Sequence, residues 1–404
     1  MRPLLWAVCG PKGGRFEAHW LHAPRATHRA LRRMRAVLIA LLAAAAARGV
    51  AAVERSPLRP FRPSSSAPSP PPPPRLRACG VVDPSPESVL VQEAVLREAF
   101  ARVPAVFSLT IPVKLHVLHS GNSGRLSRQS IAQQMTVWND AFSGLTAPGG
   151  GADTGVRFAL NETRYHDTAT DPSLPGAWFS ACSTSNARAI SAALSERPEI
   201  YLNVYSCQPS GGLLGWTMGF PQDWAESSTN HAVFVSHATV PGGSAAPYNL
   251  GATLVHEVGH ALGLYHTFQG GCHAVSQLAA GDAVADTSPE ASAAYGGAQA
   301  LSGRDTCTTV GHSDASLGPW FGRDPTSSFM DYSDDAAMHV FSPGQAARLK
   351  LMILTHKPSW CTHNQPFGSC DAQEGGSAGE PRSPPPPPFP TLTPEVRPPP
   401  LVTM

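Results

Sequence analysis

The chain has 404 residues, which is enough for one large domain with flanking segments. Thirty basic residues against 29 acidic residues give a formal net charge of +1. Because no basic run lies in the central part, the charge predicts neither a nucleic-acid partner nor binding to an anionic membrane surface.

The first predicted element is a secretory signal peptide over residues 34–52. It has a basic start, an apolar run of about a dozen residues and small residues at its end. That run is too short to cross a bilayer, so we expect a secreted protein without a membrane span. Translation starts at Met1 or at Met34, and residues 1–33 have no predicted role.

Proline-rich segments flank the central domain. Polyproline runs occupy much of residues 53–105 and of the tail, residues 362–404. Such segments cannot bury a core and are predicted to be extended. Two interpretations stay open for them, a passive spacer or an attachment to a cell wall or matrix.

The central domain, residues 106–361, alternates predicted strands and helices. Apolar runs predict strands at 111–119, 156–165, 200–206 and 231–240, and helical spacing predicts helices at 127–142 and 186–197. This alternation predicts an α/β (α+β) fold, with a mixed sheet and helices packed on it. We expect residues 231–240 to form the edge strand along which an extended substrate pairs.

Two short motifs add detail to this domain. The run from Ser342 to Gln345 has an N-cap serine, a proline at the first helical position and a glutamine at the third, so it predicts the start of a further helix. Asn161 begins an Asn-Glu-Thr sequon, which predicts a glycosylation site in a secreted protein.

The stretch HEVGHALGLYH predicts a metal site. His256 and His260 lie one helical turn apart, with Glu257 beside them. Gly263 can end the helix and turn the chain, which brings His266 back towards the same point. Three imidazoles leave one position of a Zn²⁺ ion open, so the site is predicted to be catalytic, with Glu257 as the general base.

A second motif follows downstream, in SSFMDYSDD at residues 327–335. Met330 is expected beneath the three imidazoles as an apolar floor. Tyr332, two residues on, can bring its hydroxyl to the zinc and donate a hydrogen bond to an oxyanion. A lone Met-Asp-Tyr is usually an ordinary loop, but after an extended zinc motif it indicates a methionine turn.

These motifs give the chain a resemblance to a known family. The stretches 247–272, 281–290, 327–335 and 341–349 resemble the pappalysin family of metzincin metallopeptidases, especially small secreted microbial and fungal members. The similarity covers roughly residues 106–361. It implies a metzincin fold, with a larger upper subdomain (106–265), a smaller irregular lower subdomain (266–361) and a cleft between them.

Cysteine parity adds a prediction about latency. Of eight cysteines, Cys9 precedes the signal-peptide cleavage point, so seven remain and one thiol is left unpaired. Cys79 is the best candidate for it. In the resembled family a propeptide cysteine can occupy the open zinc position, which makes residues 53–105 a linker and propeptide. The alternative is that Cys79 pairs with Cys361 or Cys370.

The other six cysteines are expected to form disulfides. Cys272 and Cys307 match a bridge of the resembled family, and Cys182–Cys207 and Cys361–Cys370 complete the set as guesses. A second family bridge, from the region of Gly296 to Ala337, has neither cysteine here.

The resemblance also implies a structural Ca²⁺ ion in the stretch GDAVADT. Asp282 and Thr287 are the candidate ligands, through carboxylate and carbonyl oxygens. Asp286 is either an outer partner of that site or a simple turn residue.

Together these features predict a secreted zinc endopeptidase made as a latent precursor, with proteins or peptides as substrates. The rival is a non-catalytic matrix or cell-wall binding protein on a metzincin scaffold. Asp334 and Asp335 lie near the expected pocket for the residue after the cut and favour a basic side chain there, whereas Ala336 adds no charge. Activation is expected to follow cleavage after Arg97 or Arg102.

Overall fold

A computed structural model describes residues 76–99, 107–272, 281–307, 322–363 and 370. The predicted signal peptide, residues 1–33, the polyproline run before residue 76, Arg102 and the tail beyond Cys370 lie outside these residues. Within the described part, none of the helices combines the length and apolarity that crossing a membrane requires.

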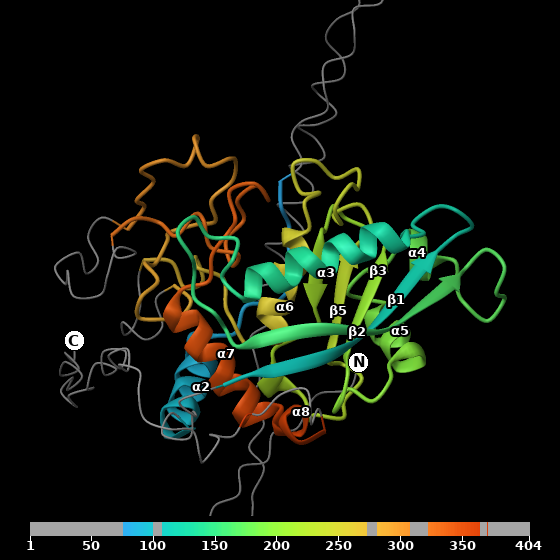
Figure 1. Cartoon of the computed structure of the whole chain (residues 1–404), viewed down its shortest axis with the longest axis horizontal. Coiled ribbons are helices and arrows are strands. Elements are labelled where there is room, and N and C mark those ends of the chain that lie inside the picture. Colours follow the sequence, from blue (N-terminus) through green and yellow to red (C-terminus); the bar gives the residue numbers. More distant parts are fainter. Residues whose placement is uncertain (1–75, 100–106, 273–280, 308–321, 364–369, 371–404) are drawn as a thin grey trace, which may run out of the picture. The chain divides into compact units, whose positions relative to one another are not determined.

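A five-stranded sheet forms the centre of the fold (Figure 1). The strands are β1 (Leu109–His119), β2 (Val156–Asp167), β3 (Leu202–Cys207), β4 (Gly215–Thr217) and β5 (Ala232–Ser236), in the spatial order β2-β1-β3-β5-β4. All neighbours are parallel except β4, which runs antiparallel to β5. The predicted mixed sheet is therefore confirmed.

The predicted edge strand was wrong. β5, from the stretch 231–240, lies inside the sheet between β3 and β4, and each of its five residues is buried. A continuous buried apolar run is typical of a central strand, since both of its faces are covered. The edge strand next to β5 is instead β4, a three-residue strand that carries Gly215, and β2 forms the opposite edge.

Helices cover both faces of the sheet. α3 (Arg128–Phe142) begins at the N-cap Ser127, packs on β2 and contacts α6 (Ala252–Ala261), which packs on β4 and β5. On the other face, α5 (Ala187–Leu194) and the short α4 (Ala177–Ser180) share a cluster with Tyr205, Phe234 and Trp216. Alternate side chains of the strands therefore feed two apolar layers.

Beyond His266 the chain is mostly irregular until α7 (Pro343–His356) and α8 (Pro358–His363). α7 begins as its sequence predicts, because Ser342 and Gln345 form a reciprocal capping box. Leu349 and Ile353 of α7 join the main core beside Val255 and Val258 of α6. The irregular part is thus fixed to the sheet through the core that α6 and α7 share.

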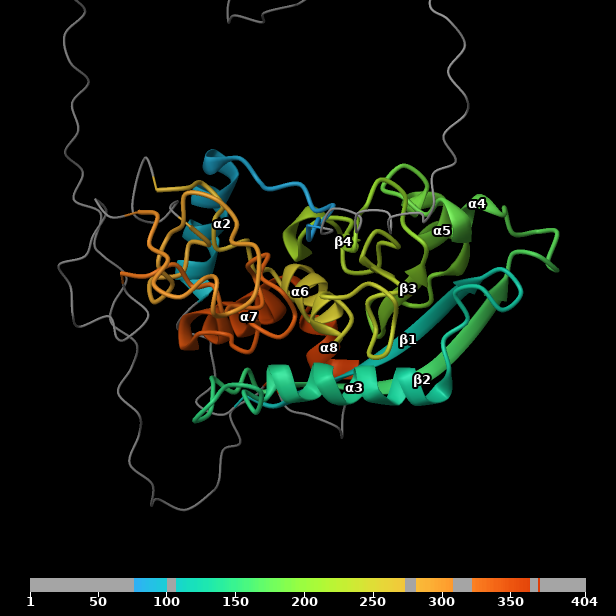
Figure 2. The same cartoon turned by 90° about the horizontal axis from the view of Figure 1, so that it is seen from above.

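The residues 76–99, called the N-terminal segment below, run across this domain and end in α2 (Pro86–Ala99). α2 lies beside α7 in both views (Figures 1 and 2) and contacts it. Leu96 and Ala99 pack on Leu351 and Met352 there. The 3₁₀ turn η2 (Pro221–Asp223) also contacts α7.

Three disulfides link Cys182 to Cys207, Cys272 to Cys307 and Cys361 to Cys370, the same pairs that the sequence suggested. Cys79 is a free thiol. Asn161 is exposed on β2, where the register between β1 and β2 shifts by one residue. Its side chain is therefore accessible, and its glycosylation stays a prediction.

Candidate metal centre and active site

α6 presents two of the three predicted histidine ligands. It starts after Gly251, whose φ is +96°, and its residues 252–260 are all buried. His256 and His260 occupy the same face one turn apart, as their spacing predicts. The local apolar sequence therefore places two imidazoles inside the protein rather than on its surface.

Gly263 brings the third imidazole back. Its φ is +95°, and a Cβ atom at this position would lie 2.5 Å from the Met352 side chain. Only glycine fits both the left-handed backbone and that close packing. The chain reverses here, and His266 returns to the other two rings.

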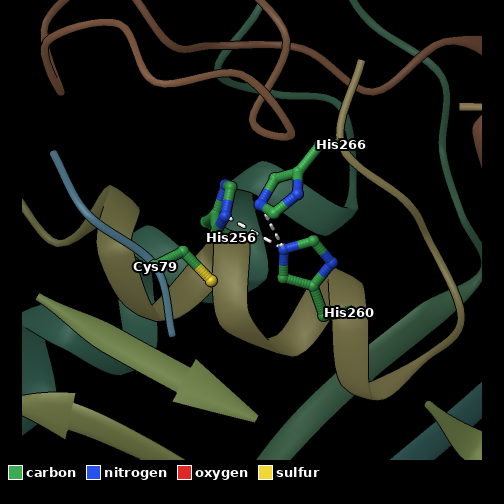
Figure 3. A group of neighbouring side chains, drawn as sticks. All are labelled: Cys79, His256, His260 and His266. Carbon is green, nitrogen blue, oxygen red and sulfur yellow. Dashed lines mark hydrogen bonds between the residues drawn. The ribbon is translucent and has the colours of Figure 1, made fainter. Parts of the chain in front are cut away.

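The three Nε2 atoms converge on one point (Figure 3). Nε2 of His260 lies 3.1 Å from Nε2 of His256 and 3.1 Å from Nε2 of His266. Tetrahedral Zn²⁺ with bonds of 2.0–2.1 Å would place such atoms about 3.3 Å apart. Burial, the largest cause, lowers the pKa of His256 and His260 well below the usual value, so both rings are neutral. Neutral imidazoles are the form that binds zinc.

Each ring also has a partner at its other nitrogen, Nδ1. The partner is the Phe329 carbonyl at 2.7 Å for His256, the Leu264 carbonyl at 2.8 Å for His260 and the Asp83 carboxylate at 2.9 Å for His266. Because each acceptor calls for N–H at Nδ1, the lone pairs of all three rings are at Nε2. Three lone pairs that face each other fit a cation between them.

Cys79 completes this group. Its Sγ atom and one nitrogen of each histidine all lie within 4.8 Å of one another (Figure 3). Within the described residues, no other three or more His, Cys, Asp or Glu side chains come together in this way. Burial, followed by the Glu257 charge, raises the pKa of the Cys79 thiol well above its usual value. A bound Zn²⁺ would oppose that shift, because it binds the thiolate.

Glu257 lies between the metal group and the edge strand. Its Oε2 accepts a hydrogen bond from Cys79 Sγ at 3.3 Å. Burial raises the pKa of Glu257 to about 8, against the opposing effects of Cys79 and Arg77. A Cβ atom on Gly215 would lie 2.7 Å from Glu257 Cγ. The glycine of β4 therefore leaves the space that this carboxylate occupies.

Met330 lies against α6, the helix that carries two of the three histidines. It is fully buried, and a Cβ atom on Gly259 would lie 2.4 Å from its sulfur. The glycine within the zinc motif thus lets the methionine approach the helix. The Tyr332 ring lies 5.1 Å from the His266 ring. Burial raises the pKa of Tyr332, so the phenol stays protonated.

The N-terminal segment pairs with the edge strand next to this group. Leu214 N donates to Ala78 O at 2.9 Å, and Gly80 N donates to Gly215 O at 3.0 Å. Cys79 and Gly215 form a parallel β-bridge. Main-chain pairing therefore fixes the cysteine at the level of the metal group.

Arg77 occupies a buried polar pocket close by. Its guanidinium forms an ion pair with Asp335, donates to Thr253 Oγ1 at 3.2 Å and to Ser333 O at 3.2 Å, and lies over the Tyr248 ring. Its side chain is 2% exposed. Of the predicted pocket residues, Asp335 thus binds a basic group directly, whereas Asp334 does not and Ala336 is exposed.

The predicted calcium ligands have hydrogen-bond partners within the protein. Asp282 Oδ2 accepts from Gln345 Nε2 at 2.7 Å, and Oδ1 accepts from Val284 N at 3.1 Å. The Thr287 hydroxyl lies 3.4 Å from that of Ser342. Both carboxylate oxygens of Asp282 thus accept N–H groups of the protein, and calcium binding stays a prediction.

Asp286 is a helix-capping residue. Its carboxylate accepts from Ser342 Oγ at 2.6 Å and from Gly344 N at 2.7 Å. The sequence left two roles open for Asp286, an outer partner of a calcium site or a turn residue. This contact at the start of α7 favours the role of a turn residue.

Comparisons with known proteins agree with this site. The peptidase M43 family model, described as pregnancy-associated plasma protein-A, matches residues 197–353. Extracellular metalloprotease 1 of Coccidioides posadasii is 36% identical over 284 residues, which cover 68% of this chain and 88% of the relative. The chain belongs to the M43 (pappalysin) family of metallopeptidases.

A further relative supports the family assignment, and solved structures support the fold. An extracellular metalloprotease of Pyricularia oryzae is 35% identical over 287 residues, covering 68% of this chain and 88% of the relative. A promirolysin mutant from Tannerella forsythia matches 71% of this chain and 98% of its own, with a TM-score of 0.56 and 22% identity. Mature mirolysin with a cleaved peptide gives a TM-score of 0.51 over 64% of this chain and 99% of its own, also at 22% identity. The fold is that of a metzincin, as predicted.

Proposed function

We propose that this pappalysin is a secreted zinc endopeptidase made as a latent precursor, in which Cys79 occupies the open metal position. The observation that carries the proposal is the group of Cys79 Sγ with three histidine nitrogens within 4.8 Å. A thiolate is a strong zinc ligand, and three histidines alone would leave that position to water. The names of the fungal relatives and the predicted signal peptide support secretion.

Hydrolysis requires that the N-terminal segment leaves. When bound at the three histidines, zinc supplies a Lewis acid and lowers the pKa of water. Glu257 then takes a proton from the attacking water and gives it to the leaving amine. Tyr332, whose hydroxyl stays protonated, donates its hydroxyl hydrogen to the developing oxyanion.

The contacts of the N-terminal segment also suggest how substrates bind. β4 offers backbone groups to an extended peptide, as it now does to Ala78 and Gly80. The pocket around Asp335 holds a guanidinium, so we propose that it accepts Arg or Lys side chains of substrates. Cleavage after Arg97, in the last turn of α2, or after Arg102 would separate this segment from β1.

The test compares the full-length protein before and after limited proteolysis, on casein and gelatin, with and without a zinc chelator. We expect chelator-sensitive hydrolysis that increases on cleavage. Protein that contains zinc and stays inactive after loss of the N-terminal segment would favour the rival, a non-catalytic matrix-binding protein. Hydrolysis that a chelator does not affect would contradict the zinc mechanism.

A further inference from the structure

The three predicted zinc ligands are held in two different ways. His256 and His260 each have a backbone carbonyl of the catalytic domain at Nδ1. His266 instead has Asp83 Oδ1 at 2.9 Å, and Asp83 belongs to the N-terminal segment. One ligand therefore depends on a residue that activation removes.

No described side chain of the catalytic domain replaces that contact. The Phe268 ring stacks on His266 at 4.7 Å, and the Tyr332 ring meets it edge-on at 5.1 Å. These rings restrain the plane of the imidazole but offer no acceptor to its Nδ1. The His266 side chain is 2% exposed and that of Asp83 is 42% exposed, so Asp83 lies at the rim where water can enter once it leaves.

A carboxylate at Nδ1 changes what the imidazole does at its other nitrogen. It holds the N–H at Nδ1, keeps the lone pair at Nε2 directed to the metal and makes that nitrogen a stronger donor. A water in its place would hold the ring less firmly, because it is free to rotate and carries no charge. Loss of such an outer partner typically weakens metal binding by about 10- to 100-fold.

We propose that Asp83 is a positioning residue for His266, so that the N-terminal segment stabilises bound zinc through two separate contacts, Cys79 at the metal and Asp83 behind the third histidine. Only four positions separate them in the sequence, and one release removes both. Activation would then open the fourth zinc position and loosen the third ligand in the same event. The inference rests on the proposed function, since it needs zinc at the three histidines.

The experiment measures transfer of zinc from the full-length protein to a chromogenic chelator. We expect Asp83→Ala to release zinc about 10- to 100-fold faster than the unmodified chain. Glu87→Ala is the matched control, because Glu87 is an exposed carboxylate of the same segment with no contact to a histidine, and it should release zinc at the unmodified rate. Release from Asp83→Ala at that same rate would overturn the proposal.

Cobalt substitution shows whether the segment stays docked in the variant. A thiolate-to-cobalt charge-transfer band that persists in Asp83→Ala, together with faster release, supports the positioning role. If the band is lost, Asp83→Asn decides, because the amide oxygen still accepts from Nδ1 but carries no charge. Faster release from that variant with the band intact supports the proposal, and an unchanged rate overturns it.

The failure of the proposed function gives a different result. If the unmodified full-length chain binds no zinc, or if its cobalt form lacks the thiolate band, the zinc and Cys79 assignments fail before Asp83 is considered. If the unmodified chain binds zinc and its cobalt form has the thiolate band, but the Asp83 variants release zinc at the unmodified rate, the inference fails and the proposed function stands.

Discussion

The catalytic domain and the N-terminal segment are held by different forces. The domain has an apolar layer on each face of its sheet, and the larger layer extends from β1 through α3 and α6 to α7 and α8. The N-terminal segment adds only small clusters around Val89 and Leu96, and two buried ion pairs, Arg77–Asp335 and Glu93–Arg348. Burying charges costs desolvation that largely offsets their attraction, whereas losing one partner is costly. The segment is thus specifically placed without sharing the core, which suits its proposed removal on activation.

The largest expected effect is on chemistry in the domain. Glu257→Gln keeps the shape of the side chain but removes the base, so activated protein should lose peptidase activity by at least about 100- to 10,000-fold. Casein hydrolysis measures the loss, and metal analysis should show unchanged zinc. Activity close to that of the unmodified enzyme would refute the assigned base. A matched loss of zinc would mean that the variant has disturbed the metal group instead.

The next effect concerns the segment. Cys79→Ser should make the full-length protein active without cleavage, with a rise of about tenfold or more, because a neutral hydroxyl binds zinc far less well than a thiolate. Activity is measured on a peptide library before any processing, which also shows whether basic residues follow the cut. In the unmodified latent form, thiol labelling under denaturing, non-reducing conditions should modify Cys79 alone. A disulfide at Cys79 would rule out the switch.

A smaller effect shows how far a buried ion pair, as distinct from the apolar contacts, holds the N-terminal segment in place. Removing the charge of Glu93 leaves Arg348 buried with no carboxylate partner. Complete loss of one partner of a buried ion pair costs about 3–5 kcal/mol of stability, and the cost is smaller if the new amide oxygen still accepts a hydrogen bond from Arg348. Glu93→Gln should therefore increase trypsin cleavage after Arg97 by at least about tenfold, since each 1.4 kcal/mol is about tenfold in an equilibrium. Glu98→Gln, an exposed neighbour on α2, is the matched control. Equal cleavage of both variants would show that apolar packing alone holds the segment.

The smallest effect is a pH dependence within the domain. Burial raises the pKa of Asp282 from 3.8 to about 7. Between about pH 4 and 7 the folded state then binds more protons at this group than the unfolded state, so its contribution to stability falls as pH rises. Urea unfolding of Asp282→Asn should lose less stability over this range than the unmodified protein. An equal slope for both would place the titration elsewhere.

How much the sequence could predict depended on how local each feature is. The positions of His256, Glu257, His260 and His266 follow from helical geometry and one glycine turn, so their convergence could be predicted. The capping box of α7 is local as well. The pairing order of the strands is not a local feature. The position of β5 in the sequence, close before α6, suggests proximity to the cleft and therefore an edge strand, which is wrong.

Long-range contacts of the N-terminal segment were the main features missed. Cysteine parity identified Cys79, but nothing in a single sequence connected Asp83 to His266 or Arg77 to Asp335, which lie 183 and 258 positions apart. Gly215 was also missed, since its role is to leave space for Glu257. The position of Arg77 and Asp83 in the sequence is the signal that could have found them. Arg77 lies two positions before Cys79 and Asp83 lies four positions after it, so a metal-binding cysteine brings both charges near the metal.

Asp335 has a consequence for how such an enzyme can diversify. One oxygen of its carboxylate faces Arg77, and the other accepts from Leu250 N at 2.8 Å and Ala252 N at 3.3 Å, at the start of the helix that carries two metal ligands. A substitution that removes the charge of Asp335 from the proposed substrate pocket therefore also removes the acceptor that holds that helix end. We expect inherited variation in substrate preference to accumulate at the neighbouring Asp334 and Ala336, while Asp335 is kept by a constraint that has nothing to do with substrates.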